Sequence, residues 1–332
     1  MGRQPRLDAP GALHHIMGRG IERTRIFRTG QDREDFLNRL ADLCIYGNLI
    51  VYAWVLMPNH FHLLVRTGRQ SISKSMRKLL TGYVVNFNLR HKRYGHLFQN
   101  RYKSIICEDD PYLLELTRYI HLNPLRADMV GDLKQLRHYR WAGHSAIMGR
   151  VKRDWQDIKT ITAYFGKGLR AVEKYEQYVR EGVSYGKRPE LVGGGLIRSL
   201  GGWSQVLSLR RKRVKVASDE RILGRGEFIQ RLLSEAEERE KETLRLGREV
   251  PDLGMLVEKI IRGEGIGESE LRSGVRKREV VKARRLFCQL AIGKMGYPGA
   301  EVARFLGVTT SSVNRLAVSE GVAKLNEYLK LF

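Results

Sequence analysis

The sequence predicts an α+β fold: a ferredoxin-like antiparallel sheet with packed helices, followed by a mostly α-helical C-terminal region with a helix-turn-helix. Three observations predict it. Residues 13–123 read as β-α-β-β-α-β-α, the split βαβ order of a ferredoxin-like sheet with one helix added. Pro58 and Asn59 separate two strongly apolar runs, as in a hairpin. Two short helical patterns flank a glycine turn at 307–309.

The N-terminal elements follow from residue spacing and from helix-starting residues. Apolar residues recur at helical spacing through Phe36, Leu40 and Leu43. Ser71 can cap the next helix, and Pro111 suits the first turn of another. The expected elements are a strand at 13–17, a helix at 31–46, a hairpin at 49–66, a helix from 71 to about 93, a strand at 104–107 and a helix from 109 to the Asn123-Pro124 break.

Composition divides the rest of the chain. Glycines at 193–195 and 201–202 and a basic run at 209–215 predict a linker or helical basic segment over 151–219. Residues 220–332 are expected to form a helical DNA-binding domain. Its helices are predicted at 227–247, 280–295, 299–306 and 310–317. A plain helical bundle is the alternative to a helix-turn-helix here.

Charge points to a polyanionic partner. Among 332 residues, Lys and Arg number 60 against 36 Asp and Glu, which gives a net charge of +24. Such an excess attracts nucleic acid first and an anionic membrane surface second. The longest apolar run is too short to cross a bilayer, so no membrane insertion is expected. Three scattered cysteines and the lack of a signal peptide favour a reducing cytoplasm.

A pair of histidines follows the hairpin turn. His60 and His62 are two residues apart on a predicted strand, so both imidazoles leave the same face. Two imidazoles on a rigid strand can begin a metal site. The alternative is a pair of solvated histidines on an edge strand.

A tyrosine and an amide share one helix face further along the chain. Tyr119 and Asn123 are four residues apart, so a hydroxyl nucleophile and an amide oxygen approach the same point. If that face packs over the strand, Tyr119 and Asn123 join His60 and His62. Tyr119 could also be an ordinary core residue, and Tyr112 is the rival nucleophile on the same helix. His121, two residues away, points elsewhere and is expected to be structural.

Two separated motifs carry a family resemblance. Residues 57–65 read MPNHFHLLV, and residues 118–127 read RYIHLNPLRA. Together they resemble the IS200-like Y1 transposases, which belong to the HUH endonucleases, and most of all the repetitive-palindrome-associated branch. The resemblance covers about residues 10–145 and makes residues 1–150 the catalytic domain. Residues 280–317 more weakly resemble the DNA-binding domain of bacterial replication initiator proteins.

The resemblance implies a role for each motif residue. His60 and His62 become the metal-binding pair, Asn123 the third metal ligand and Tyr119 the single nucleophile. Relatives use Gln at the position of Asn123, and both side chains supply an amide oxygen. The implied reaction cleaves and rejoins DNA through a 5′-phosphotyrosine and leaves a free 3′-hydroxyl. Mixed nitrogen and oxygen ligands suit Mn²⁺ better than Mg²⁺, and Mg²⁺ is the ion expected in the cell.

The expected substrate is single-stranded or hairpin DNA. Basic helices and exposed aromatic residues on a small sheet suit a folded single strand. Candidate DNA contacts are Arg19, Arg23, Arg25, Lys74, Arg77, Arg101 and Lys103, with Thr310, Ser311, Asn314 and Arg315 in the helix-turn-helix. A DNA-binding regulator without turnover and an RNA-hairpin binder are the competing interpretations. The resemblance implies a homodimer with shared active sites or, for the palindrome-associated branch, a monomer.

Overall fold

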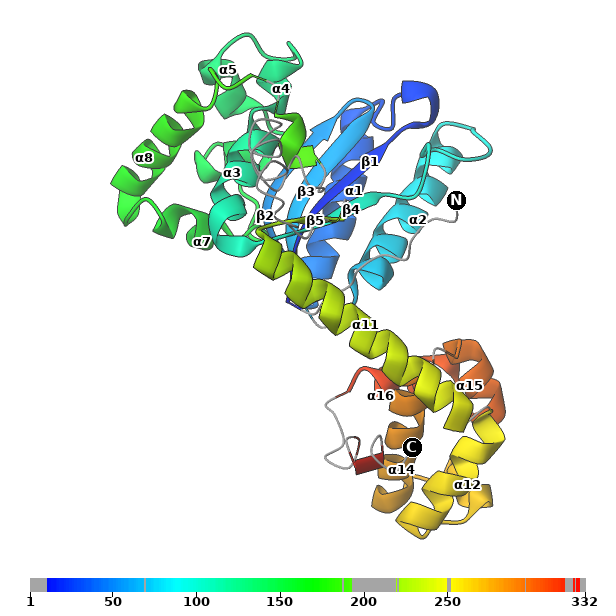
Figure 1. Cartoon of the computed structure of the whole chain (residues 1–332). Coiled ribbons are helices and arrows are strands. Elements are labelled where there is room, and N and C mark those ends of the chain that lie inside the picture. The colour runs from blue at the N-terminus through cyan, green and yellow to red at the C-terminus, as the bar shows by residue number, and fades with distance from the viewer. Residues whose placement is uncertain are drawn as a thin grey trace. The chain divides into compact units, whose positions relative to one another are not determined.

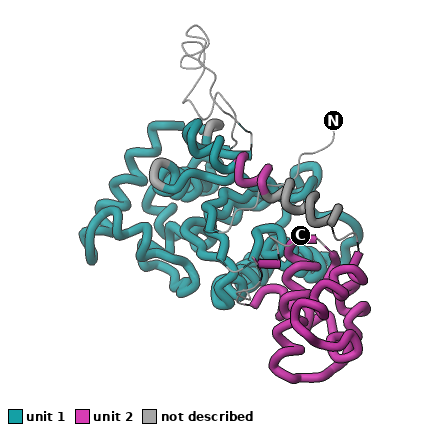
Figure 2. Tube along the Cα trace, turned by 60° about the horizontal axis from the view of Figure 1, so that its bottom comes forward, with its two compact units in different colours: residues 1–232 teal, residues 233–332 magenta. Residues whose placement is uncertain are grey.

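The computed structural model describes residues 11–68, 70–186, 188–192, 219, 221–249, 252–295, 297–319, 325 and 327–328. The chain divides into two compact units, residues 1–232 and 233–332 (Figure 2). The predicted glycine-rich stretches and the basic run at 209–215 lie outside the described residues.

The first unit contains one mixed five-stranded sheet (Figure 1). Its strands are β1 (Leu13–Arg19), β2 (Leu49–Met57), β3 (His60–Thr67), β4 (Lys103–Cys107) and β5 (Ile222–Leu223), in the order β2-β3-β1-β4-β5. The first four strands pair antiparallel in the ferredoxin-like order, and β5 runs parallel to β4. The predicted α+β class is confirmed.

Helices cover both faces of the sheet (Figure 1). On one face, α1 (Gly30–Ile45) and α2 (Ile72–Arg90) pack against Phe61, Leu63 and Val65 of β3. On the other face, α3 (Asp109–His121) packs over Leu64 and the strands beside it. Alternate residues of β3 therefore enter two separate cores, and this alternation places His60 and His62 on the α3 side.

Local capping fixes where the helices begin. Thr29 and Asp32 form a capping box at the start of α1, in which each side chain accepts from the other residue's backbone N–H. The Ser71 side chain accepts from the backbone N–H of Lys74 and so caps α2, as predicted.

The segment after α3 is more ordered than predicted. It contains α4 (Asn123–Arg126), α5 (Leu133–His138), α6 (Gly143–Ile147), α7 (Ile158–Ala163), α8 (Gly168–Glu181) and the 3-10 helix η2 (Pro189–Val192). Residues 151–219 were predicted to be a linker or a helical basic segment, and the described part up to residue 192 contains helices that belong to the first unit. Ala171, Tyr175 and Val179 of α8 are buried at helical spacing, so this helix extends the core beside α3.

The predicted boundary at residue 220 also differs from the structure. Ile222 and Leu223 belong to the sheet of the first unit as β5. Backbone N–H groups of Ile106 and Glu108 donate to the carbonyls of Arg221 and Leu223, at 2.9 Å each. These bonds satisfy the edge of β4, which a helical segment could not do.

The second unit is helical. It contains most of α11 (Gly226–Glu249), then α12 (Leu253–Glu264), α13 (Glu268–Leu271), α14 (Arg278–Cys288), the π-helical turn η3 (Gln289–Lys294), α15 (Gly299–Leu306) and α16 (Thr310–Ala317). Gly307 ends α15 with a left-handed φ of 66°, which glycine adopts at low cost. Thr309 then caps α16. The two helices and the tight turn between them occupy the predicted positions.

None of the described helices has the length and apolar character needed to cross a membrane. Cys44, Cys107 and Cys288 are free thiols.

Buried histidines should make the first unit sensitive to acid. His121 and His144 are buried and both contact the Tyr175 hydroxyl, at 2.7 Å and 2.9 Å from Nδ1. Burial lowers the pKa of His144 to about 4 and that of His121 well below its usual value. The unfolded chain then binds more protons, so stability is full above pH 6.5 and falls toward pH 4. The expected loss is up to about 1.4 kcal/mol per group and pH unit.

Urea unfolding followed by tryptophan fluorescence checks this prediction, because Trp54, Trp141 and Trp155 lie in the first unit. His144→Gln is the control and should show a shallower pH dependence. Equal unfolding free energies of the wild type at pH 7 and pH 5 would contradict the prediction.

Candidate active site

A fixed turn positions the histidine pair. Pro58 and Asn59 join β2 to β3, and the backbone pairs Met57 with His60. The Pro58 carbonyl accepts from the backbone N–H groups of Ile26 and Phe27, at 2.9 Å and 3.1 Å. The loop between β1 and α1 therefore holds the turn from outside, and His60 starts β3 at a defined place.

Three predicted side chains meet on the α3 side of the sheet. The rings of His60 and His62 lie edge to face with centroids 5.3 Å apart. The Tyr119 ring lies nearly perpendicular to His62, at 6.0 Å between centroids. His62 is 6% exposed, whereas His60 and Tyr119 are half-buried. The tyrosine thus reaches the histidines from α3, across the layer between helix and sheet.

Asn123 stands at the start of α4, directly after the helix that carries Tyr119. Its amide nitrogen donates to the backbone carbonyls of Tyr119 and Ile120, at 3.0 Å and 3.3 Å. The amide nitrogen is therefore hydrogen-bonded to the last turn of α3, and Oδ1 is the atom that could bind a metal. Its role as a metal ligand stays a prediction.

A third histidine, His15 of β1, was missed by sequence reasoning. Its Nε2 lies 3.0 Å from Nδ1 of His62, and its ring is 6.1 Å from that of Tyr119. The strand register explains the contact, because Met17 pairs with His62 and His15 is two residues along on the same face. The signal in the sequence was a polar residue at a core position of a predicted strand.

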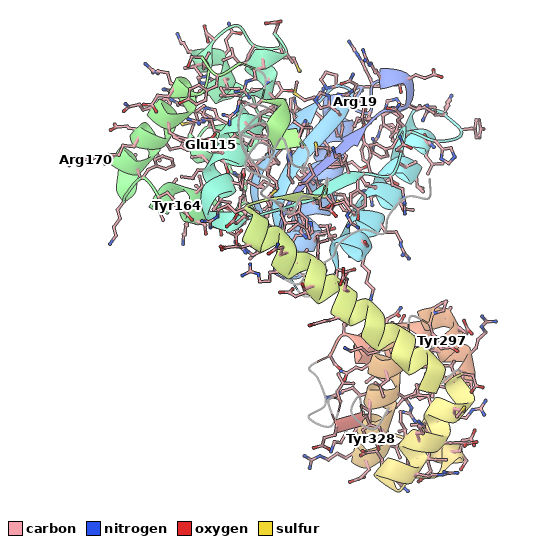
Figure 3. All side chains as sticks on the ribbon, viewed as in Figure 1. Arg19, Glu115, Tyr164, Arg170, Tyr297 and Tyr328 are labelled. Carbon is pink, nitrogen blue, oxygen red and sulfur yellow. The ribbon has the colours of Figure 1, made fainter. Side chains whose placement is uncertain are left out.

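Burial and charge keep the pair neutral. The pKa of His60 is lowered to about 4, first by burial and then by the charge of Arg19. The pKa of His62 lies well below its usual value because of burial, its histidine neighbours and Arg19. Arg19 pairs with His60 across β1 and β3 and stands at the end of β1 (Figure 3). Neutral imidazoles keep the lone pairs that bind a metal.

The free nitrogen atoms fit a divalent ion. Nδ1 of His60 lies 2.7 Å from Oδ1 of Asn59, and Nδ1 of His62 is bonded to His15. Each ring therefore has Nε2 left for a metal. With Oδ1 of Asn123, the donors would be two nitrogens and one neutral oxygen, a set that leaves coordination positions open. No cluster of three His, Cys, Asp or Glu side chains suited to a metal occurs among the described residues.

Arg126 is a further residue at the site that sequence reasoning missed. Its guanidinium carbon is 5.4 Å from the centre of the Tyr119 ring, within cation–π range. Its two terminal nitrogens also donate to the carbonyls of Tyr119 and Gly182, at 3.4 Å and 3.1 Å. A positive charge is thus held beside the tyrosine. The quoted motif contains Arg126, but its spacing from Tyr119 gave no signal.

The alternatives on α3 have other surroundings. Burial, and then the charge of Glu108, raises the pKa of Tyr112, which disfavours the phenoxide. His121 is completely buried and bonded to Tyr175, so its expected structural role is confirmed.

The predicted DNA contacts of the first unit are all exposed: Arg19, Arg23, Arg25, Lys74, Arg77, Arg101 and Lys103. The first three lie at the end of β1 and in the loop after it, the next two in the first turns of α2, and the last two lead into β4. The Lys103 ammonium also donates to the Val192 carbonyl at 2.8 Å. Their contacts with DNA stay a prediction.

Thr310, Ser311, Asn314 and Arg315 are exposed on α16, whereas Val313 is buried in the second unit's core. Asn314 also packs against Gly299 of α15, where an added Cβ would come within 2.3 Å of the amide oxygen. This contact ties Asn314 to the fold and leaves Ser311 and Arg315 as the better candidates for a ligand.

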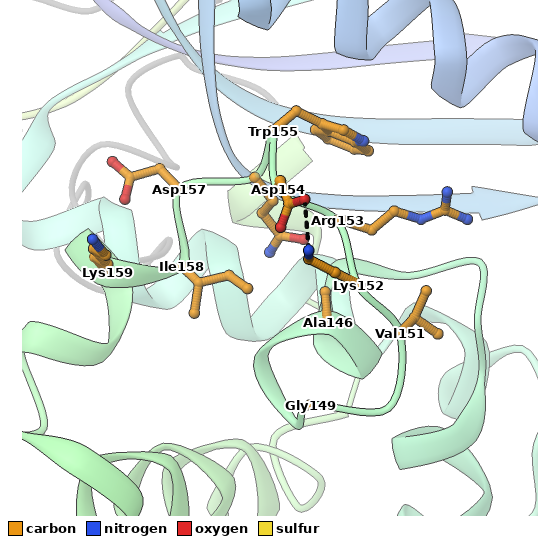
Figure 4. A pocket seen from close by; sticks show the side chains of 11 residues that line it. Ala146, Gly149, Val151, Lys152, Arg153, Asp154, Trp155, Asp157, Ile158 and Lys159 are labelled. Carbon is orange, nitrogen blue, oxygen red and sulfur yellow. Dashed lines mark ion pairs between the residues drawn. The ribbon is translucent and has the colours of Figure 1, made fainter.

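A hollow in the first unit lies away from the histidines. It has a volume of about 630 Å³ and is lined by residues between Ala146 and Lys159 (Figure 4). Trp155 in its wall packs on Trp54 of β2, at 5.5 Å between ring centroids. Its lining includes none of the predicted site residues, and an exposed Lys152–Asp154 ion pair spans 3.3 Å beside it. We therefore centre the candidate site on the histidines.

Comparisons with known proteins bear on the first unit. Residues 11–123 match the family model described as "Transposase IS200 like". The predicted resemblance to IS200-like transposases is confirmed over this segment, which contains His60, His62, Tyr119 and Asn123. No curated protein matches the chain. The likeness of residues 280–317 to replication initiators stays a prediction.

One similar solved structure is described as "Structure of the REP associates tyrosine transposase bound to a REP hairpin". It is 15% identical, with a TM-score of 0.37, and the match covers 47% of this chain and 90% of that chain.

The charge of Arg19 should have a measurable effect on the pKa of His60. In Arg19→Gln, we expect the pKa of His60 to rise from about 4 but to stay below 6.5, because burial remains the larger cause. Proton NMR of the imidazole C–H signals against pH measures the shift. Arg25→Gln, an exposed arginine of the same loop, is the matched control. An unchanged pKa in Arg19→Gln would show that Arg19 does not act on the site.

Proposed function

We propose that the chain is a metal-dependent transposase, a single-strand DNA endonuclease that cleaves and rejoins hairpin-bearing DNA through a covalent phosphotyrosine. The observation that carries the proposal is the Tyr119 ring, set 6.0 Å from His62 of the histidine pair inside the segment that matches the IS200-like family. Tyr119 is the nucleophile. His60, His62 and Asn123 hold Mg²⁺ or Mn²⁺.

The reaction is a transfer between oxygens. A bound metal would sit on Nε2 of both histidines and Oδ1 of Asn123, and it would supply positive charge to the phosphate's non-bridging oxygens. The Tyr119 oxygen attacks phosphorus, an O–P bond forms, and the bond to the 3′-oxygen breaks. The products are a 5′-phosphotyrosine and a free 3′-hydroxyl. A 3′-hydroxyl reverses the step and restores the tyrosine, so rejoining needs no ATP.

The chain's own residues prepare this step. Buried, neutral imidazoles offer lone pairs without first losing a proton. Arg126 holds a positive charge beside the Tyr119 ring, where the phenol must lose its proton. Exposed arginines at the end of β1 can hold the backbone of a DNA strand close to His60. A homodimer with shared sites stays a prediction.

Hairpin DNA is the proposed substrate. The net charge of +24 favours a polyanion, and the basic residues cluster on the loop before α1, the start of α2 and the approach to β4. The similar solved structure holds a REP hairpin, by its description. The free thiols of all three cysteines fit the proposed cytoplasmic location.

A covalent-adduct assay tests the activity. Wild-type protein, end-labelled single-stranded hairpin DNA from the regions flanking its gene, and Mg²⁺ or Mn²⁺ should give a protein–DNA band on a denaturing gel. Tyr119→Phe should lose this band completely, because the nucleophilic oxygen is gone. Tyr112→Phe is the matched control on the same helix and should keep it.

Other results would change the assignment. An adduct that survives in Tyr119→Phe and disappears in Tyr112→Phe would move the nucleophile. Tight hairpin binding without an adduct under any metal would favour the regulator without turnover. Stronger binding of an RNA hairpin than of the same DNA hairpin would favour the RNA binder.

We also propose that α16 contacts duplex DNA. Ser311 and Arg315 are exposed on the helix after the Gly307 turn, as in a recognition helix. This second contact would let the chain bind a duplex near the hairpin that it cleaves.

Arg315→Ala should weaken duplex binding by about 1–3 kcal/mol if the guanidinium contacts a base edge, and less if it contacts a phosphate. Fluorescence anisotropy at several salt concentrations measures the loss. Arg262→Ala removes an exposed arginine of α12 and is the matched control, with little loss expected. Equal affinities of wild type and Arg315→Ala would remove α16 from the interface.

A further inference from the structure

A series of hydrogen bonds leads from the backbone to the predicted metal-binding histidines. The Leu191 carbonyl lies 3.1 Å from Nδ1 of His15, and Nε2 of His15 lies 3.0 Å from Nδ1 of His62. The two imidazoles stack with centroids 5.2 Å apart and planes 29° from parallel. His15 is completely buried, so water does not compete for these bonds.

The donor and acceptor of each hydrogen bond follow from the carbonyl at which the series ends. A carbonyl oxygen only accepts, so Nδ1 of His15 carries the proton and donates it to Leu191. In the neutral ring Nε2 of His15 is then an acceptor, and Nδ1–H of His62 donates to it. This leaves the lone pair of His62 on Nε2, the nitrogen that would bind a metal.

We propose that His15 is a positioning residue, which fixes His62 in the Nδ1–H tautomer and aims its Nε2 at the metal. The proposal deepens the proposed function and rests on it. An imidazole without such a partner is free to place its proton on either nitrogen, and the Nε2–H form cannot bind a metal through Nε2. Partners of this kind typically change metal affinity about 10–100-fold.

The Leu191 carbonyl, at which this series of hydrogen bonds ends, lies outside the segment that matches the family. Leu191 belongs to η2 (Pro189–Val192), whereas the IS200-like match ends at residue 123. The 3-10 helix is held by Lys103, which donates to the Val192 carbonyl at 2.8 Å, and by the Arg188–Glu115 ion pair at 3.3 Å. Residues beyond the matched segment therefore help to set the state of a site residue within it.

His60 has a different arrangement. Its Nδ1 is 2.7 Å from Oδ1 of Asn59, whose amide nitrogen donates to the Arg23 carbonyl at 3.2 Å. The amide oxygen accepts, so His60 also carries its proton on Nδ1. Both histidines thus present Nε2, but only His62 depends on a buried imidazole for this.

The test compares two substitutions of His15. His15→Leu removes the acceptor, whereas His15→Gln keeps an oxygen that can accept from His62. NMR of the protein with ¹⁵N-labelled histidine, free of metal, identifies the protonated nitrogen of His62 directly. We expect Nδ1–H in the wild type and in His15→Gln, and loss of that preference in His15→Leu.

Metal affinity is the second measurement. Titration with Mn²⁺ followed by electron paramagnetic resonance should show binding weakened about 10–100-fold in His15→Leu and less in His15→Gln. His14→Leu is the matched control, because His14 is an equally buried neighbour bonded to Ser104 at 3.0 Å. It should bind Mn²⁺ like the wild type.

Each outcome decides the proposal. An Nε2–H tautomer of His62 in the wild type, or unchanged tautomer and Mn²⁺ affinity in His15→Leu, would overturn it. An equal loss of affinity in His14→Leu would also overturn it, because general destabilisation would then explain the effect. If wild type forms no adduct with DNA but His15→Leu loses both the tautomer and Mn²⁺ affinity, the phosphotyrosine chemistry fails and the positioning role stands.

Discussion

The site depends on the register between β1 and β3 at the centre of the sheet. Met17 pairs with His62 and Arg19 with His60, which sets His15 beside His62 on the face covered by α3. A slip of one residue would turn both histidines of β3 toward α1 and α2, into a core of Phe36, Leu40 and Tyr83. Phe61, Leu63 and Val65 prevent the slip, because it would carry these apolar side chains out of that core.

The charge of the protein and the neutrality of its site are compatible. The chain carries +24, and Arg19 stands next to the histidine pair. The same positive field that attracts a DNA backbone lowers the pKa of His60 and His62, so the imidazoles stay uncharged. A positive surface is therefore compatible with both the proposed attraction of DNA and the proposed metal binding, and burial contributes the larger part of each pKa shift.

The first unit extends well past the segment that matches the family. Helices α4 to α8 continue the core on the α3 side, with Tyr175 bonded to His121 and His144. Gly182, just after α8, accepts from Arg126, and η2 accepts from His15. Apart from Asn123 at the start of α4, these additions contain none of the predicted ligands, yet they contact residues of the candidate site. The strand β5 completes the edge of the sheet.

The sequence by itself determined the elements and the motifs. Alternation of apolar residues, the Pro58-Asn59 turn and the cap at Ser71 are local signals, so the first four strands and the start of α2 could be predicted, whereas β5 could not. The spacing of His60 and His62 fixed their common face, whereas a common face for Tyr119 and Asn123 stays a prediction. Only the tertiary structure decided which side chains meet across those faces. His15 and the Leu191 carbonyl come from parts of the chain distant from His62, and no periodicity links them. Arg126 is close to Tyr119 in the sequence, but its contact with that ring depends on how α4 follows α3. Contacts of this kind depend on packing between elements, which local sequence patterns do not encode.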